Sequence, residues 1–127
     1  MMITRKSNSE DAFTIERHGE VTLITATPAL EHLEFGLEEQ AAELILKPLM
    51  RQENPLIVFD LSRVDYFGSM FLALLIRCWK LALSQGGAMA LSGVTPRIRE
   101  LLRVTSLDIV WPLYETKQEA MEAFELD

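Results

Sequence analysis

Residues 56 to 61 read LIVFDL, a short and continuous apolar run that follows Pro55. A strand with one face in water alternates apolar and polar side chains, whereas a strand that is covered on both faces does not. Strands of the second kind belong mainly to parallel sheets, whose crossover connections lay helices over the sheet. This run therefore predicts an α/β domain with a central sheet between helices.

Other segments show the periods of further strands. Residues 13–17 and 21–26 alternate around His18-Gly19, which predicts an opening β-hairpin. Two more strands are expected, at Ala88–Leu91 and at Ile109–Tyr114. Because Pro112 has no backbone donor, the last strand is expected at an edge of the sheet.

Four helices are expected between and after these strands. The first carries an apolar stripe of Leu37, Ala41, Leu44 and Ile45, and Pro48 is expected to disrupt or end it. The second covers Ser69 to Gln85 and stops at Gly86-Gly87. The third begins at Thr95-Pro96, and the fourth at a capping box of Thr116 and Glu119. Together with the strands, this order predicts a mixed sheet that is flanked by helices.

The chain is expected to form one domain. Its 127 residues, 49% of them hydrophobic, suit a single core, with residues 1–10 as a flexible arm and residues 11–127 as the domain. Cys78 is the only cysteine, which excludes an intrachain disulfide and favours a reducing cytoplasm. The most apolar stretch, Met70–Leu83, is too short and too charged to cross a bilayer, and the polar N-terminus does not resemble a signal peptide.

The charge balance excludes some classes of partner. Twelve Lys and Arg residues against 19 Asp and Glu residues give a net charge of −7. Nucleic acids need a basic surface for their phosphates, and anionic membranes repel an acidic protein. The main partner is therefore expected to be neither a nucleic acid nor a membrane.

Residues that carry chemistry do not form a recognisable set. The two histidines, His18 and His32, have no metal-ligand spacing, and no phosphate-binding glycine loop is present. Cys78 lies in a run of Leu, Ile and Trp, where a buried and inert thiol is expected. Asp60, at the end of the LIVFD strand, is expected to bond to backbone groups of the next turn. We expect no metal, no cofactor and no catalysis; a small enzyme is the least favoured alternative.

The second helix has one polar stripe. At about 100° per residue, that stripe contains Ser69, Ala73, Arg77, Lys80 and Ser84. Ser69, at its head, can be read as a helix N-cap or as a regulatory residue. Met70, Leu72 and Ile76 beside the stripe can belong to the core or to an apolar patch for a partner. Positive charge on this helix and the third suits an acidic partner.

Three segments resemble STAS domains of the anti-sigma factor antagonist family. The first reads LIVFDLSRVDYFGSMFLALLIR, from Leu56 to Arg77; the others are QGGAMALSG and VTPRIRELLRVTSLDIVWPLYET. An apolar strand that ends in Asp-Leu-Ser and a serine that opens an apolar helix are typical of this family. The resemblance extends over roughly residues 13–125 and implies the STAS fold.

The resemblance also implies a function. Such proteins bind an anti-sigma factor that is also a serine kinase of the GHKL type. Phosphorylation of the serine that opens the second helix releases them, and in this chain that serine is Ser69. The expected interface consists of Gly68, Met70, Ala73, Ile76, Arg77 and Lys80, with Ser69 as the phosphoacceptor. The family's Asp-Ser-(Ser/Thr)-Gly is Gly68-Ser69-Met70-Phe71 in this chain. The altered motif also fits a STAS adaptor without a phosphoswitch, such as the cytoplasmic subunit of a lipid-transport ABC complex.

Overall fold

The computed structural model describes residues 12–32 and 37–125; the proposed arm at residues 1–10 lies outside them. Five strands form one sheet in the order β1-β2-β3-β4-β5. Their bounds are β1 Phe13–His18, β2 Val21–Ala26, β3 Leu56–Asp60, β4 Ala88–Ser92 and β5 Leu113–Tyr114. The β1–β2 hairpin is antiparallel and the other pairs are parallel, so the predicted mixed α/β sheet is confirmed.

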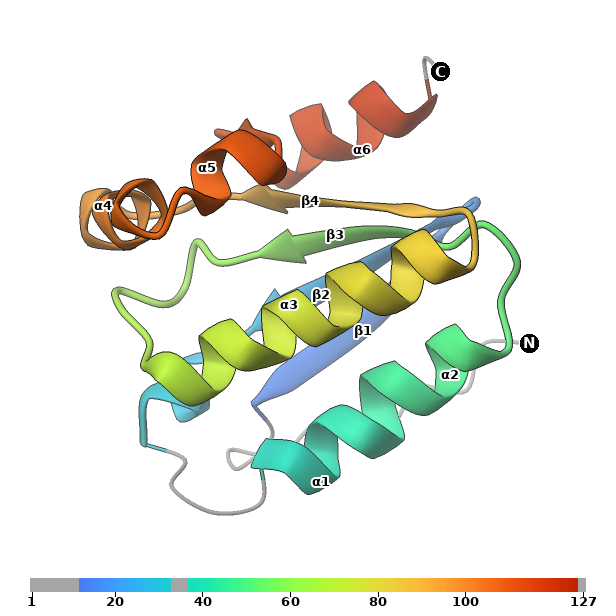
Figure 1. Ribbon diagram of the computed structural model, residues 1–127, viewed down its shortest axis with the longest axis horizontal. Coiled ribbons are helices and arrows are strands. Elements are labelled where there is room, and N and C mark those ends of the chain that lie inside the picture. Colours follow the sequence, from blue (N-terminus) through green and yellow to red (C-terminus); the bar gives the residue numbers. More distant parts are fainter. Residues whose placement is uncertain (1–11, 33–36, 126–127) are drawn as a thin grey trace.

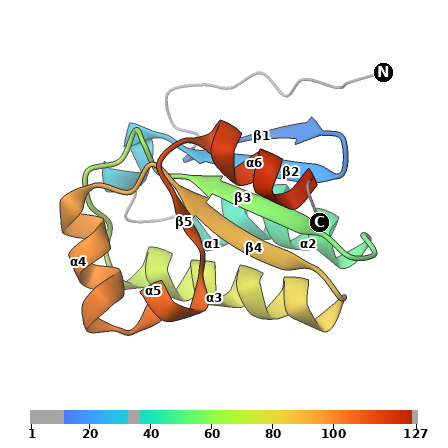
Figure 2. The same cartoon turned by 90° about the horizontal axis from the view of Figure 1, so that it is seen from above.

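Helices cover both faces of the sheet (Figures 1 and 2). One face is covered by α1 (Leu37–Ala41), a π-helical segment (Ala42–Leu46), α2 (Lys47–Met50) and α3 (Ser69–Ser84). The other face is covered by α6 (Lys117–Glu125), while a 3-10 turn (Pro28–His32), α4 (Pro96–Val104) and α5 (Leu107–Val110) complete the structure. No helix in the described ranges is long and apolar enough to span a bilayer.

The central strand β3 lies between two cores, as its sequence predicts. Ile57 and Phe59 belong to the large core under α3, while Val58 belongs to a small core beneath α6. All three side chains are completely buried. Successive side chains of a strand point to opposite faces of the sheet, and both faces are covered by helices here. Every residue of this segment therefore has to be apolar or otherwise suited to burial.

The prediction that Pro48 disrupts or ends the first helix is confirmed in its first alternative: the regular α-helix is interrupted just before the proline, but helical structure continues to Met50. The preceding turn is π-helical, and the Lys47 N–H donates to the carbonyl of Ala42, five residues earlier. This wider turn opens the hydrogen-bond ladder just before the proline. Pro48 then occupies the first turn of α2, where its missing donor is not needed.

The strand expected at Ile109–Tyr114 is largely wrong. Only Leu113–Tyr114 pairs with β4, although the strand does lie at the sheet edge, as Pro112 indicated. Ser106 adopts a left-handed backbone conformation (φ 62°) after α4, and α5 begins at the next residue. The Trp111 N–H closes this turn on the Leu107 carbonyl at 3.0 Å, so the chain reaches the sheet at Leu113, four residues later than predicted.

Candidate functional site

The helix α3 presents a polar stripe to solvent, as its sequence predicts. All five members of the stripe are exposed: Ser69, Ala73, Arg77, Lys80 and Ser84. Two large apolar side chains beside it are also exposed, Met70 by 55% and Leu83 by 51%. Leu72 and Ile76 are half-buried and pack against the core. The exposed face of α3 is thus partly apolar at both ends of the helix.

Ser69 is the first helical residue of α3 and not its cap. The N-cap is Gly68, which has extended backbone angles (φ −93°, ψ −174°). The first bond of this turn runs from the Leu72 N–H to the Gly68 carbonyl at 3.2 Å, so no side chain caps the helix. The interpretation of Ser69 as an N-cap is therefore wrong. Within the described residues its hydroxyl forms no hydrogen bond and is exposed to solvent.

The loop that carries Gly68 and Ser69 is fixed at its start by a buried carboxylate. Asp60 is 5% exposed and accepts hydrogen bonds from the hydroxyls of Ser62 (2.8 Å) and Ser92 (3.0 Å). The predicted bonds from backbone groups are thus replaced by bonds from side chains. Ser62 belongs to the loop and Ser92 ends β4, so the carboxylate ties the loop to the neighbouring strand.

A second set of contacts holds the middle of the loop against α4. The hydroxyl of Thr95 donates to the Asp65 carbonyl at 2.7 Å, and also accepts from the Ile98 N–H at 3.2 Å as the predicted N-cap of α4. Arg97 donates to the Asp65 carboxylate at 3.0 Å. Its guanidinium also lies 4.5 Å from the centroid of the Tyr66 ring, in cation–π geometry.

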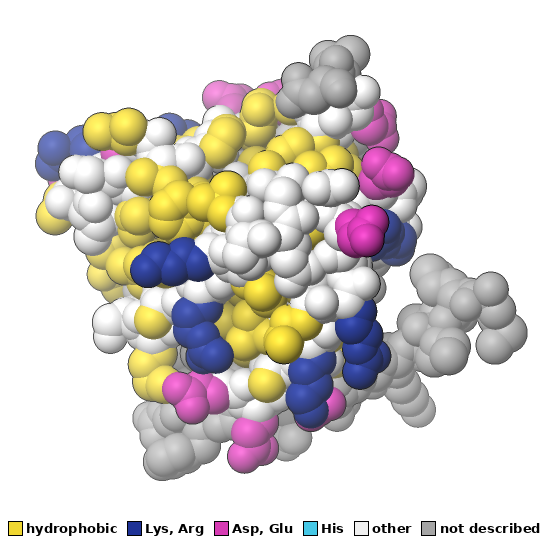
Figure 3. Space-filling view, turned by 45° about the vertical axis from the view of Figure 1, so that its right-hand side comes forward, with side chains coloured by type: hydrophobic (Ala, Val, Ile, Leu, Met, Phe, Trp, Pro, Cys, Tyr) yellow, Lys and Arg dark blue, Asp and Glu magenta, His cyan; other side chains and the backbone are white. Residues whose placement is uncertain are grey.

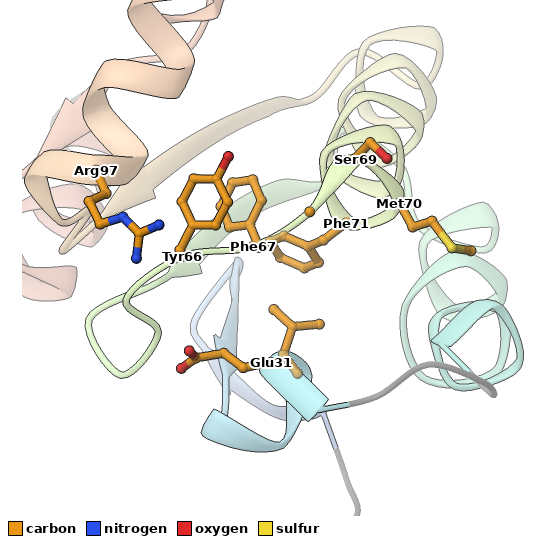
Figure 4. Close-up of a pocket in the computed structure, with 9 residues that line it drawn as sticks. Glu31, Tyr66, Phe67, Ser69, Met70, Phe71 and Arg97 are labelled. Carbon is orange, nitrogen blue, oxygen red and sulfur yellow. The ribbon is translucent and has the colours of Figure 1, made fainter.

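Ser69 borders an open depression of about 520 Å³ at the carboxyl end of the sheet (Figure 4). The figure shows Arg97 and Tyr66 at one side of it, Ser69 and Met70 at the other, and Glu31 on the 3-10 turn below. Its lining is Leu30, Glu31, Tyr66, Phe67, Gly68, Ser69, Met70, Phe71 and Arg97. The depression contains both charge signs and several apolar groups, which suits a protein surface better than one small ligand.

A narrower groove lies between α1 and α3. It has a volume of about 150 Å³ and is lined by Glu38, Ala41, Met70, Ala73, Leu74 and Arg77. Four of these side chains are apolar, while Glu38 and Arg77 supply one charge of each sign. A groove of this size and character accepts one apolar side chain from a bound protein.

Known proteins resemble this chain over most of its length. A family model of the STAS domain matches residues 5–120. The chain belongs to the STAS domain family. A curated relative is the anti-sigma F factor antagonist of Paenibacillus polymyxa, 23% identical over 112 residues, which are 88% of this chain and 93% of the relative.

Solved structures agree with this assignment. A STAS-domain anti-sigma-factor antagonist protein from Planctomyces limnophilus is 35% identical, with a TM-score of 0.77; the match covers 87% of this chain and 96% of that one. An anti-sigma factor antagonist from Mycobacterium paratuberculosis is 25% identical, with a TM-score of 0.69 over 87% of this chain and 91% of that one. Each comparison thus includes a relative of this STAS domain that is described as an anti-sigma factor antagonist.

The titratable groups of this STAS domain form no reactive pair in the described part. Cys78 is fully buried, and burial raises the pKa of its thiol to about 12, so it is not a nucleophile at neutral pH. His18 is exposed, 3.4 Å from Glu16 at the hairpin turn. In the described ranges, no three His, Cys, Asp or Glu side chains cluster as metal ligands would.

Sequence reasoning identified the α3 side of the site but missed its other side. It grouped Arg97 with the general positive charge of the third helix and gave no role to Glu31 or Tyr66. The structure brings these three residues to the same depression as Ser69. Their only local signal was Thr95-Pro96, which placed the start of α4 and hence Arg97 in its first turn.

Proposed function

We propose that this STAS domain is an anti-sigma factor antagonist of the cytoplasm that binds, through α3, an anti-sigma factor that is also a GHKL-type serine kinase. The observation that carries the proposal is the position of Ser69. It is exposed and lies at the head of the exposed stripe of α3, at a helix start that no side chain caps. The relatives that are anti-sigma factor antagonists support the partner class.

The proposed interface combines apolar contact with charge. Met70 and Ala73 line the groove between α1 and α3, where an apolar side chain of the partner would insert. Arg77 and Lys80 follow on the same stripe, and Gly68 exposes backbone at its head. Ile76, half-buried beside them, would contact the partner at the edge of the interface. No metal or cofactor takes part in this binding, and the antagonist acts by occupying the anti-sigma factor rather than by catalysis.

Phosphorylation of Ser69 would act on binding and leave the fold intact. A phosphate adds about −1.5 to −2 charges at pH 7. The N–H groups at the start of α3 and the helix dipole favour a negative charge there, so the domain tolerates it. A partner packed on Met70 and Ala73 would instead have to bury a dianion, which costs several kcal/mol. The modified antagonist would therefore dissociate.

The test uses two variants of one residue with the purified anti-sigma kinase of the source organism. Ser69→Asp should weaken binding by at least ~100-fold, equivalent to about 2.7 kcal/mol, because it buries a charge. Ser69→Ala should bind as wild type does and should no longer be phosphorylated by the kinase with ATP. The thermal midpoints of both variants should stay close to that of the wild type. Equal binding by Ser69→Asp and wild type would refute the phosphoswitch.

The altered motif supports one alternative, a STAS adaptor with a constitutive interface. Met70 stands where the family has a second hydroxyl, and it is 55% exposed on the face that would bind the partner. An exposed thioether suits a stable apolar contact with a transport complex. Intact mass spectrometry of protein isolated from growing cells discriminates the two. A fraction heavier by one phosphate, lost in Ser69→Ala, supports the antagonist, and its absence supports the adaptor.

A further inference from the structure

The exposed cations of α2 and α3 have no acidic residue beside them on these helices. The sequences KPLM of α2 and SMFLALLIRCWKLALS of α3 contain neither Asp nor Glu. Arg77 and Lys80 on α3, and Arg51 immediately after α2, are exposed. None of the three forms an ion pair within the described residues, whereas Lys47, Arg97 and Arg103 each do. Glu38 of α1 lines the groove beside Arg77 but forms no ion pair with it in the described part of the chain, so in a protein of net charge −7 these cations still make a basic surface.

Apolar side chains are also exposed near the C-terminal ends of these two helices. Met50, at the end of α2, is 65% exposed, and Leu83, near the end of α3, is 51% exposed. The two helix ends are held together, because the Gln85 amide donates to the Leu49 carbonyl at 2.7 Å and also to the Gln52 carbonyl. Figure 3, in which these ends come forward, shows a hydrophobic patch with Lys and Arg side chains around it and Asp and Glu side chains beside some of them. An apolar centre with a charged rim is the anatomy of a protein interface.

We infer that this basic–apolar face, formed by Met50, Arg51, Arg77, Lys80 and Leu83, is the part of the antagonist that recognises an acidic, apolar-centred surface of the anti-sigma factor. The inference rests on the proposed function and extends its interface from the Ser69 end of α3 to the opposite end and onto α2. Charge complementarity indicates an acidic surface on the partner, because cations that form no ion pair within the domain gain the most binding energy from opposite charges on the partner.

The same observations disfavour other occupants. Three free cations are fewer than the clusters of about four to eight that hold proteins at anionic membranes. The net charge of −7 opposes a nucleic acid. A second copy of this chain could offer the exposed Glu119, Glu122 and Glu125 of α6. Such a contact would join two different surfaces and would lead to rings or open chains of subunits.

The test compares two double charge reversals that change the net charge equally. Arg77→Glu with Lys80→Glu reverses the basic–apolar face. Arg99→Glu with Lys117→Glu reverses two exposed cations on α4 and α6, which also lack ion pairs in the described part of the chain. Each is titrated by calorimetry against the purified anti-sigma factors of the source organism. The first should weaken binding by ~100-fold and the control by less than about threefold.

Each other result contradicts the inference in a distinct way. If wild type binds an anti-sigma factor and both double variants bind it equally, the face is not the recognition surface, while the proposed function stands. If wild type binds none of the anti-sigma factors, the proposed function fails and this inference fails with it. Sedimentation of the protein alone, and with anionic lipid vesicles, completes the test. Self-association or vesicle binding that the first variant abolishes and the control keeps would assign the face to another occupant and overturn the inference.

Discussion

The guanidinium of Arg97 lies 4.5 Å from the centroid of the Tyr66 ring, which joins the first turn of α4 to the loop that presents Ser69. The same guanidinium bonds to Asp65 at 3.0 Å, so one side chain holds two neighbouring loop residues. Both partners of that ion pair are more than half exposed, and the ion pair alone therefore contributes little. The stacking on the Tyr66 ring therefore fixes the position of the guanidinium relative to the loop.

Removal of this stacking should cause a small loss of stability. Arg97→Ala should lower the free energy of unfolding by about 0.5–1.5 kcal/mol, because cation–π contact at an exposed site and a surface ion pair each contribute up to about 1 kcal/mol. Arg97→Lys keeps the charge but loses the planar stack, so its free energy of unfolding should lie between those of wild type and Arg97→Ala. Urea unfolding measures the change. Arg99→Ala, on the same helix, is the control, and an equal loss in both variants would contradict a specific role for Arg97.

Loss of a hydrogen bond to the buried Asp60 should cost more. Ser92 is completely buried and donates to the carboxylate at 3.0 Å. Ser92→Ala should lower the free energy of unfolding by about 1.5–3 kcal/mol, the range for bonds to charged groups. Ser84→Ala is the matched control, since its hydroxyl is exposed and bonds to a backbone carbonyl of its own helix. Urea denaturation that gives the same value for both variants would show that the Asp60 contacts do not stabilise the loop.

The thiol of Cys78 should make stability fall at high pH. Burial raises its pKa from 9.0 to about 12, so the folded state keeps the proton that the unfolded chain loses above pH 9. Because the folded pKa is the higher one, this contribution is complete below pH 9 and is lost as the pH rises toward 12. The slope should be about 1.4 kcal/mol per pH unit in this window. The difference between wild type and Cys78→Ala in the free energy of unfolding, measured as a function of pH, isolates the contribution of the thiol. Identical slopes for the two proteins would refute this contribution.

Ser106 carries backbone strain that a glycine would relieve. Its φ of 62° lies in the left-handed region, which costs an L-residue with a side chain about 1–2 kcal/mol. Glycine removes this cost but makes the unfolded chain more flexible by about 0.5–1 kcal/mol. Ser106→Gly should therefore raise the free energy of unfolding by roughly 0.5–1 kcal/mol and raise the thermal midpoint. A lower midpoint would mean that the serine side chain contributes to the α4–α5 junction.

The elements that could be predicted are those with a strong local signal. The run LIVFD fixed β3 because only a strand buried on both faces needs five apolar or enclosed residues in succession. The caps at Thr95 and Thr116 were also predictable, since each hydroxyl accepts from the N–H three residues later. The exposed stripe of α3 followed from a helical period that continues without a break for four turns.

The predictions that failed depend on neighbours that are remote in sequence. Ile109 and Val110 look like strand residues, yet they are helical and exposed because Trp111 is drawn against Trp79 of α3, with ring centroids 6.2 Å apart. Pro48 looked like a helix end because a π-turn is invisible to periodicity. Arg97 and Tyr66 meet only because α4 packs beside the β3–α3 loop, so half of the site had no local signal beyond Thr95-Pro96 at the start of α4.

The central claim is that α3 is the surface by which this STAS domain binds an anti-sigma factor. Its most direct test is the map of backbone amide shifts in an NMR titration of the labelled domain with the anti-sigma factor. The account predicts that the largest shifts lie between Gly68 and Leu83, with further shifts at Met50 and Arg51, while the exposed side of α6 is unaffected. Shifts confined to α6 or to the β1–β2 hairpin, with α3 unchanged, would contradict it.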